Sequence, residues 1–222
     1  MSVARRVQII IGLLLALALP FAHLSTLGKR YSGLGPLWGG EAPWWALFAV
    51  IVAYVLFVER KRLSSIGYRM PGLMDIGAGV IAALISIAGV LFILNVVLPA
   101  LHLDEGQAQE ANALYATPLL YRVLLVTSAA FVEETLFRGY GFERLTEFTG
   151  SKWFAAFATF ALFGLAHYSP AGGWGDVLVG AEGGLVLTAL YAWRRNIWSN
   201  IVCHWIVDGT GFILIPMLSG AH

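Results

Sequence analysis

The sequence predicts an all-α, polytopic membrane protein with about seven transmembrane helices. Of its 222 residues, 59% are hydrophobic and only 12% are charged, and the mean hydropathy is +0.76. Such a composition is too apolar for an ordinary soluble domain. The formal net charge of +1 also lacks the excess of basic residues that nucleic-acid binding requires. Because no soluble segment or internal repeat is evident, we expect residues 1–222 to form a single integral membrane domain.

Seven apolar runs come close to the length of roughly 20 residues that crosses a bilayer. The first follows Arg5 and Arg6 and has the pattern of a signal peptide. We interpret it as a retained first span, with a signal anchor as the alternative. The second is short and is expected to draw on the stretch that ends at Trp38. The runs are about 7–27, 43–58, 72–100, 118–138, 152–168, 177–193 and 197–218.

The distribution of Lys and Arg predicts the orientation, because short cytoplasmic loops are enriched in both. On one side only Lys29 and Arg30 are found, and the 101–117 loop on that side is acidic. We therefore expect a cytoplasmic N-terminus and an outside C-terminus, in the plasma (inner) membrane if the host is bacterial. The basic residues assigned to the cytoplasmic side are Arg5, Arg6, Arg60, Lys61, Arg62, Arg69, Arg138, Arg144, Lys152, Arg194 and Arg195.

Ionisable side chains in the fourth run point to function, since such groups are costly inside a membrane. Glu133 and Glu134 are adjacent, so on a helix they point about 100° apart and cannot share one task. Glu134 and Arg138 have the i,i+4 spacing and order of a helical ion pair. Glu133 has no such cation and is the better candidate for a general base.

A histidine in the fifth run is expected at the same depth as Glu133. His167 and Phe163 share one helix face, and Gly150 lies midway between Glu133 and His167 in the sequence. A helical hairpin turning at Gly150 and Ser151 would therefore bring the two side chains level. The following 169–173 segment should break the helix and line a hydrated cavity, because irregular backbone at depth needs protein or water around it.

The seventh run carries a polar stripe on an otherwise apolar helix. Asn200, His204 and Asp208 repeat at i, i+4 and i+8. Their distance along the helix from Arg194 and Arg195 predicts that these side chains lie in the same leaflet as Glu133. Helices four, five and seven would thus form one site, opening to the cytoplasmic side, with groups that can activate water and stabilise an oxyanion.

Three motifs in these runs resemble one known family. They are Glu133-Glu134-x-x-x-Arg138, Phe163-x-x-x-His167 and His204-x-x-x-Asp208. Together they are similar to the signature of the CAAX-protease and bacteriocin-processing (CPBP, or Abi) intramembrane proteases, which include the Ras-converting CAAX endopeptidases. The resemblance covers about residues 118–212, which we expect to be a catalytic core. Asp208 departs from the family pattern, which commonly has Asn there.

The resemblance implies an intramembrane endopeptidase that acts on a membrane-tethered peptide or protein in the lipid bilayer. Glu133, helped by His167, would deprotonate a water that attacks the scissile carbonyl. His204 and Asp208 would hold the oxyanion or orient the water. Glu134, Arg138, Asn200 and Phe163 would support them. Neither the substrate, its prenylation, the cleavage position nor the oligomeric state follows from the sequence.

The resemblance leaves the metal open, since members are described both as metalloproteases and as metal-free glutamate enzymes. Zinc would be bound by Glu133, His167, His204 and Asp208 if it is present. The HExxH spacing of common zinc proteases is absent. We expect no obligatory metal.

Two other interpretations use the same polar residues. Intramembrane Glu, His and Asp also form proton relays, so a proton- or ion-coupled transporter is the alternative function. Gly173-Trp174-Gly175-Asp176 matches the GxGD string of presenilin-type aspartyl proteases, but Asp176 is expected in a loop on the outer side. The roles of Glu182 and of residues 1–117 stay open.

Overall fold

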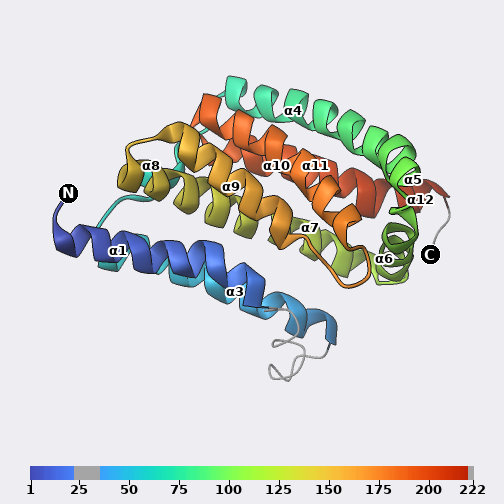
Figure 1. Ribbon diagram of the computed structural model, residues 1–222, viewed down its shortest axis with the longest axis horizontal. Helices are drawn as coiled ribbons and strands as arrows, with labels where there is room; N and C mark the ends of the chain where they lie inside the picture. The colour runs from blue at the N-terminus through green and yellow to red at the C-terminus, as the bar shows by residue number, and fades with distance from the viewer. Residues whose placement is uncertain (23–35, 220–222) are drawn as a thin grey trace.

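The computed structural model describes residues 1–22 and 36–219. In this part of the chain the regular structure is entirely helical, so the predicted all-α class is confirmed. The long helices lie side by side in one elongated bundle (Figure 1). α1 and α3 form one edge of the bundle in this view, and α4 lies along the opposite edge.

The first half of the chain forms three long helical stretches, and each of them contains a π-helical or 3₁₀ segment. Their bounds are α1 Val3–Leu13, η1 Leu14–Ala18, η2 Leu19–Ala22, α3 Pro36–Ala53, η3 Tyr54–Val58, η4 Leu63–Ile66, α4 Leu73–Phe92, η5 Ile93–Val97 and α5 Leu98–Leu101.

The second half contains the three motifs and begins with a helix that the sequence did not predict. Its elements are α6 Asp104–Tyr115, α7 Leu119–Glu133, η6 Glu134–Phe142, α8 Glu143–Thr149, α9 Lys152–Ala166, α10 Trp174–Arg194, α11 Ile197–Gly209, η7 Thr210–Leu214 and α12 Ile215–Ser219. The π-helical segment η6 starts at Glu134, and π-helical turns within α-helices are frequent at functional sites.

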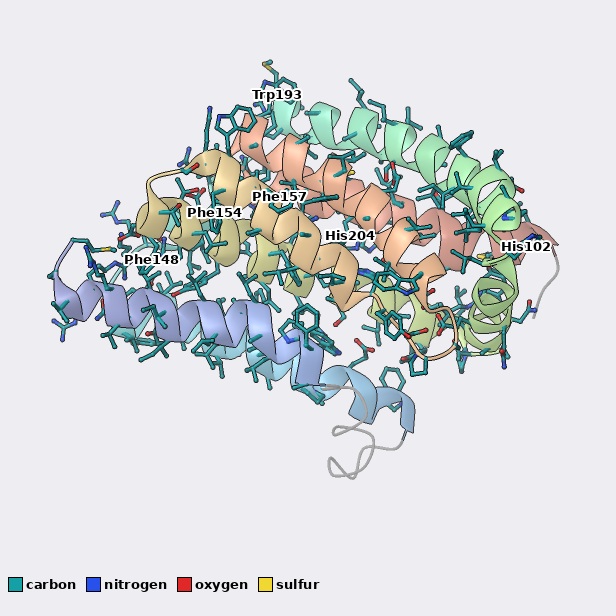
Figure 2. The ribbon with its side chains drawn as sticks, in the orientation of Figure 1. His102, Phe148, Phe154, Phe157, Trp193 and His204 are labelled. Carbon is teal, nitrogen blue, oxygen red and sulfur yellow. The ribbon has the colours of Figure 1, made fainter. Side chains whose placement is uncertain are left out.

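Each predicted apolar run coincides with a helix, but the number seven is not confirmed. Within the described residues five helices are long and apolar enough to cross a membrane, or six if the bent pair of α6 with α7–α8 is one span. α9 is apolar but shorter. Large apolar side chains such as Phe154, Phe157 and Trp193 are exposed on the outside of the bundle, as a lipid-facing surface requires (Figure 2).

Two loop assignments were wrong. The 101–117 segment forms helix α6 instead of a simple loop, and its axis bends by 119° at the break before α7. The fourth helix continues to Thr149, so Arg138 is buried inside the bundle and does not belong to the cytoplasmic charge count. The end of the first predicted span, Lys29 and Arg30 lie outside the described residues.

The predicted hairpin between the fourth and fifth runs is present. Gly150 ends α8 with φ +74°, a left-handed conformation that glycine adopts without strain. Ser151 then begins α9 as its N-cap, and its side chain accepts a hydrogen bond from the Phe154 backbone N–H. The turn therefore has the local chemistry that reverses the chain within two residues.

A buried ion-pair network joins the helices at the end of the bundle that contains the N-terminus. Glu59, which follows η3, accepts hydrogen bonds from Arg144 at 2.6 Å and from the Tyr140 hydroxyl at 2.9 Å. Arg5 of α1 lies 3.0 Å from the same carboxylate. We call this end the N-terminal end, and the opposite end, which contains α6, the α6 end.

Candidate active site

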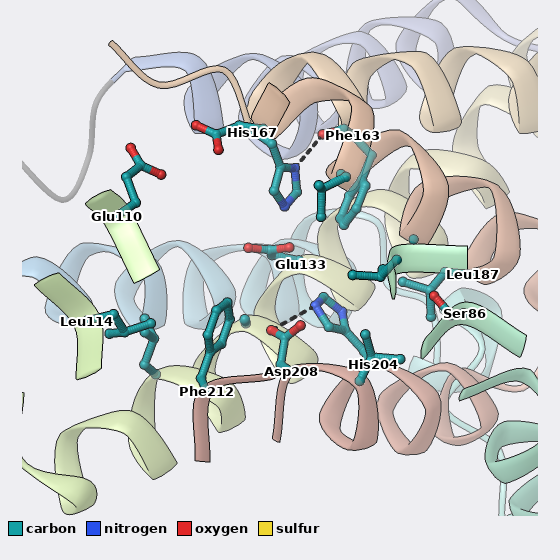
Figure 3. Close-up of a pocket in the computed structure, with 18 of the residues that line it drawn as sticks. Ser86, Glu110, Leu114, Glu133, Phe163, His167, Leu187, His204, Asp208 and Phe212 are labelled. Atoms are coloured by element: carbon teal, nitrogen blue, oxygen red, sulfur yellow. Dashed lines mark hydrogen bonds and ion pairs between the residues drawn. The ribbon is translucent and has the colours of Figure 1, made fainter. Parts of the chain in front are cut away.

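A single cavity of about 460 Å³ brings together the candidate residues of all three motifs. Glu133, Phe163, His167, His204 and Asp208 all line it, and Figure 3 shows their side chains around the same space. They come from α7, α9 and α11, which are the fourth, fifth and seventh predicted helices. The wall is completed by α4, α6, α10 and η7, which the sequence did not assign to the site.

Glu134 is the centre of the polar contacts behind this cavity. Its carboxylate accepts hydrogen bonds from Arg138 at 2.9 Å and from the Asn200 side chain at 3.0 Å. It also lies 2.9 Å from Nδ1 of His204. Glu134 and Arg138 are both completely buried, and Arg138 donates further to the Gly184 carbonyl at 3.2 Å. One carboxylate thus joins η6 to α11, and its arginine partner joins η6 to α10.

Glu133 has the opposite environment, although it is the next residue in the chain. Its Oε2 atom is buried and has no hydrogen-bond partner among the described residues. Its carboxylate faces the cavity (Figure 3). The structure therefore separates the two glutamates as their helical spacing predicts: Glu134 is saturated with partners, and Glu133 is available to a bound molecule.

His167 is oriented by its own helix end. Its Nδ1 lies 2.8 Å from the Phe163 carbonyl oxygen. Because a carbonyl can only accept, this nitrogen carries the hydrogen, and Nε2 of a neutral ring keeps its lone pair. The ring points toward Glu133 in Figure 3. A Cβ at Gly180 would lie 2.6 Å from the ring, so only glycine lets His167 pack against α10.

His204 is held between two carboxylates. Its Nδ1 faces Glu134 at 2.9 Å, and its Nε2 lies 3.4 Å from Oδ2 of Asp208. A ring with hydrogen on both nitrogens satisfies both contacts. The Asp208 contact is the longer one, and Asp208 is also the more exposed carboxylate. The Nε2 side of His204 is therefore the side that faces the cavity.

Phe163 supports the site by stacking. The Arg138 guanidinium lies 3.9 Å from the centre of its ring, a cation–π distance. The centre of the Phe163 ring also lies 4.6 Å from the centre of the His167 ring. It meets the Phe137 ring edge-on, with 5.2 Å between the ring centres. Phe163 thus links the ion pair to the histidine of the next motif.

The four residues considered for zinc do not fit a metal site in this arrangement. Among the residues that the structure describes, no three His, Cys, Asp or Glu side chains are grouped closely enough to hold a metal ion. Both nitrogens of His204 already face carboxylate oxygens, and Nδ1 of His167 faces a carbonyl.

At the α6 end of the cavity, three polar residues of the wall were missed as site residues. Glu110 of α6, Ser169 of the turn after α9 and Asp176 of α10 line the cavity at the α6 end. Asp176 lies in the first turn of α10 and not in an outer loop, which corrects our placement of the GxGD string. A presenilin-type site needs a second aspartate, and the other aspartate of this cavity, Asp208, is paired with His204. Only the polarity of the 101–117 segment could have pointed to α6.

Glu182, which the sequence left open, accepts a hydrogen bond from Ser86 at 2.7 Å. This contact joins α10 to α4, and a Cβ at Gly89 would lie 2.3 Å from the same carboxylate. Glu182 is therefore a packing partner between two helices.

The cavity extends toward the α6 end, away from the N-terminus. Its outer wall contains Glu110 of α6, Ser169 of the turn after α9, and Phe212 of η7, which follows α11. If the N-terminus is cytoplasmic, this part of the cavity lies toward the outside, which differs from the cytoplasmic opening expected from the sequence.

The fold and the site together define a membrane-embedded protein with a cavity that groups the polar residues of the three motifs. Residues 115–210 match the family described as Type II CAAX prenyl endopeptidase Rce1-like. This match contains all three motifs and confirms the resemblance for that region. It supports an intramembrane protease, a hydrolase, and does not favour the transporter. No curated protein and no solved structure was found to match the chain.

The two adjacent glutamates should respond to the same substitution with clearly different losses of stability. Glu134→Gln leaves buried Arg138 without its carboxylate, so we expect a loss of about 3–5 kcal/mol in the free energy of unfolding. Glu133→Gln replaces an unpaired buried carboxylate by a neutral amide, so stability should fall by about 1 kcal/mol or less, or even rise. Unfolding of both purified variants in detergent measures the difference. Equal destabilisation would contradict these assignments.

Proposed function

We propose that the chain is an endopeptidase that hydrolyses a peptide bond of a membrane-associated peptide or protein, using a water activated by Glu133 and His167. The observation that carries this proposal is the unpaired, buried Oε2 of Glu133 in the same cavity as His167 and His204. An unpartnered buried carboxylate oxygen is costly, and a reaction that needs a base accounts for it.

In the first step, the water oxygen attacks the scissile carbonyl carbon. The water proton passes to Glu133, with the Nε2 lone pair of His167 as a second acceptor beside it. The carbonyl oxygen becomes an oxyanion and accepts a hydrogen bond from Nε2–H of His204. Glu134 fixes the other side of that ring at 2.9 Å, and Asn200 and Arg138 in turn fix Glu134.

In the second step, the protonated Glu133 delivers its proton to the amide nitrogen and the C–N bond breaks. The products are a carboxylic acid and an amine, Glu133 is again ionised, and the proton of the acid passes to the amine to give a carboxylate and an ammonium group. Asp208 acts through His204: its carboxylate at 3.4 Å keeps a hydrogen on Nε2. In this role Asp208 has no need to donate a hydrogen bond itself, which accommodates Asp where the family pattern has Asn.

The catalytic roles predict a graded loss of cleavage. Glu133→Gln and His167→Ala should lower kcat/KM for a quenched fluorescent peptide by about 10²–10⁴-fold, the range of general acid–base catalysis. His204→Ala should lower it by about 10²–10³-fold through loss of the oxyanion donor. Each purified variant is assayed in liposomes after its folding has been checked.

His102→Ala is the matched control for these variants, because His102 is exposed at the junction of α5 and α6, away from the cavity (Figure 2). It should cleave at the wild-type rate. Wild-type cleavage by folded Glu133→Gln, His167→Ala and His204→Ala proteins would refute the mechanism.

We further propose that no metal is obligatory. The spacing of the side chains supports this, because among the described residues no three His, Cys, Asp or Glu side chains are grouped closely enough to hold a metal ion. Incubation with a strong chelator should therefore leave the rate of peptide cleavage unchanged. A loss of activity that added zinc restores, with no change in the unfolding temperature, would show that the proposal is wrong.

We also propose that the N-terminus is cytoplasmic and that the cavity opens on the opposite side. The N-terminal end contains Arg5, Lys61, Arg144 and Arg194 and follows the positive-inside rule without Arg138. Peptides presented from outside would then reach the site. This orientation favours membrane-protein tails or exported peptides over cytoplasmic prenylated C-termini as substrates.

Cysteine labelling in intact cells tests the orientation. Ala171 at the α6 end and Ser64 at the N-terminal end are both exposed, whereas the native Cys203 is buried. We expect a membrane-impermeant maleimide to label Ala171→Cys directly and Ser64→Cys only after permeabilisation. The reverse pattern would place the cavity on the cytoplasmic side.

A further inference from the structure

We propose that the outer part of the cavity, formed by Glu110, Ser169 and Asp176, is a subsite that binds a Lys or Arg side chain of the peptide substrate. We call it the acidic subsite. The proposal rests on the proposed peptidase function and adds a specificity to it. The acidic subsite lies at the α6 end of the same cavity that contains Glu133.

The cavity wall as a whole is acidic. Four carboxylate side chains line it, from Glu110, Glu133, Asp176 and Asp208, and among residues 1–22 and 36–219 no Lys or Arg belongs to its lining. At the inner end, His204 contacts the Asp208 carboxylate, so that charge has a partner. Within the described lining, His167 is the side chain next to the acidic subsite that can carry a positive charge. A cavity with walls of one sign and low dielectric concentrates ligands of the other sign.

The geometry of the acidic subsite suits a cation with several N–H groups. The Ser169 hydroxyl donates to Glu110 and accepts hydrogen bonds from the backbone N–H groups of Ala171 and Gly172, at 3.2 and 2.8 Å. Asp176 makes hydrogen-bond contact with both Ser169 and Glu110. Two carboxyl groups in contact need a shared proton between them, or a cation in its place. An ammonium offers three donors and a guanidinium five.

The backbone around the acidic subsite is shaped to hold these groups. A Cβ at Gly172 would lie 2.1 Å from the Asp176 carboxylate, and a Cβ at Gly106 would lie 2.1 Å from the Ala171 carbonyl oxygen. Glycine at both positions therefore lets the turn after α9 close against Asp176 and lets α6 pack on that turn. The three polar side chains are fixed by packing and do not form a loose surface cluster.

A separate observation shows that the cavity is built for a ligand. The Glu133 Oε2 atom is buried in the cavity without a partner among the described residues, and its carboxylate faces the same space as Glu110 (Figure 3). Between them the wall is mostly apolar and includes Ala111, Leu114 and Phe212. A peptide bound with its scissile carbonyl at Glu133 and His204 would therefore place a nearby side chain at the acidic subsite.

The test is a comparison of peptides that differ at one position. A quenched peptide is scanned on both sides of the scissile bond with Lys, norleucine or Glu and is assayed with the full chain in liposomes. At one position we expect kcat/KM for Lys to exceed that for norleucine roughly tenfold or more, as a charge-assisted hydrogen bond provides, and Glu to be the poorest. High salt should reduce the ratio.

Variants then assign the preference to residues. Glu110→Gln with Asp176→Asn should bring the Lys-to-norleucine ratio to within about twofold of one. The Glu110→Lys variant alone, on the more polar helix α6, should cleave the Glu peptide faster than the Lys peptide. It provides the test if the double variant does not fold. Glu147→Gln, which removes a carboxylate at the N-terminal end, should leave the ratio and the rate unchanged.

The failure of this proposal is distinguishable from failure of the peptidase. Cleavage of the norleucine peptide with no advantage for Lys at any position would overturn the acidic subsite and leave the peptidase intact. A Lys preference that persists unchanged in both Glu110 variants would overturn it as well. Absence of cleavage for every peptide would refute the proposed function, and the acidic subsite would fall with it.

Discussion

The site depends on one buried carboxylate, that of Glu134. Arg138, Asn200 and His204 all contact it, from η6 and α11, and none of these contacts exceeds 3.0 Å. A buried carboxylate is tolerated only with such partners, because its desolvation costs several kcal/mol. The same contacts give His204 its orientation and, through Arg138 and the ring of Phe163, fix the wall beside His167. The structural and the chemical requirements of this region are therefore met by one set of contacts.

The sequence predicted the features that depend on local spacing. The i,i+4 relation of Glu134 and Arg138 and the turn at Gly150 are both present, because each is set by residues within one or two helical turns. The apolar runs located the helices for the same reason. The roles assigned to Glu133, His167, His204 and Asp208 stay predictions, although the structure places all four in one cavity.

Features that depend on distant packing could not be predicted. α6 is polar on average, so hydropathy placed it in a loop, and its contacts with the turn after α9, with α10 and with η7 bring Glu110 to the cavity. The close contact of α9 with α10 depends on Gly180 and Gly184, whose missing side chains leave room for His167 and Phe163. From the sequence alone, α10 showed only Glu182, an acidic residue among glycines with no assigned role.

The excess of carboxylates along the cavity also bears on the end of the reaction. Hydrolysis converts a neutral amide into a carboxylate and an amine, which is protonated at neutral pH. The new carboxylate forms next to Glu133 and Asp208, and like charges at short range in a low-dielectric cavity repel each other strongly. The amine product has the opposite sign and is attracted by the same groups. In the proposed reaction the acidic wall would therefore favour departure of the carboxylate product and hold the amine product longer.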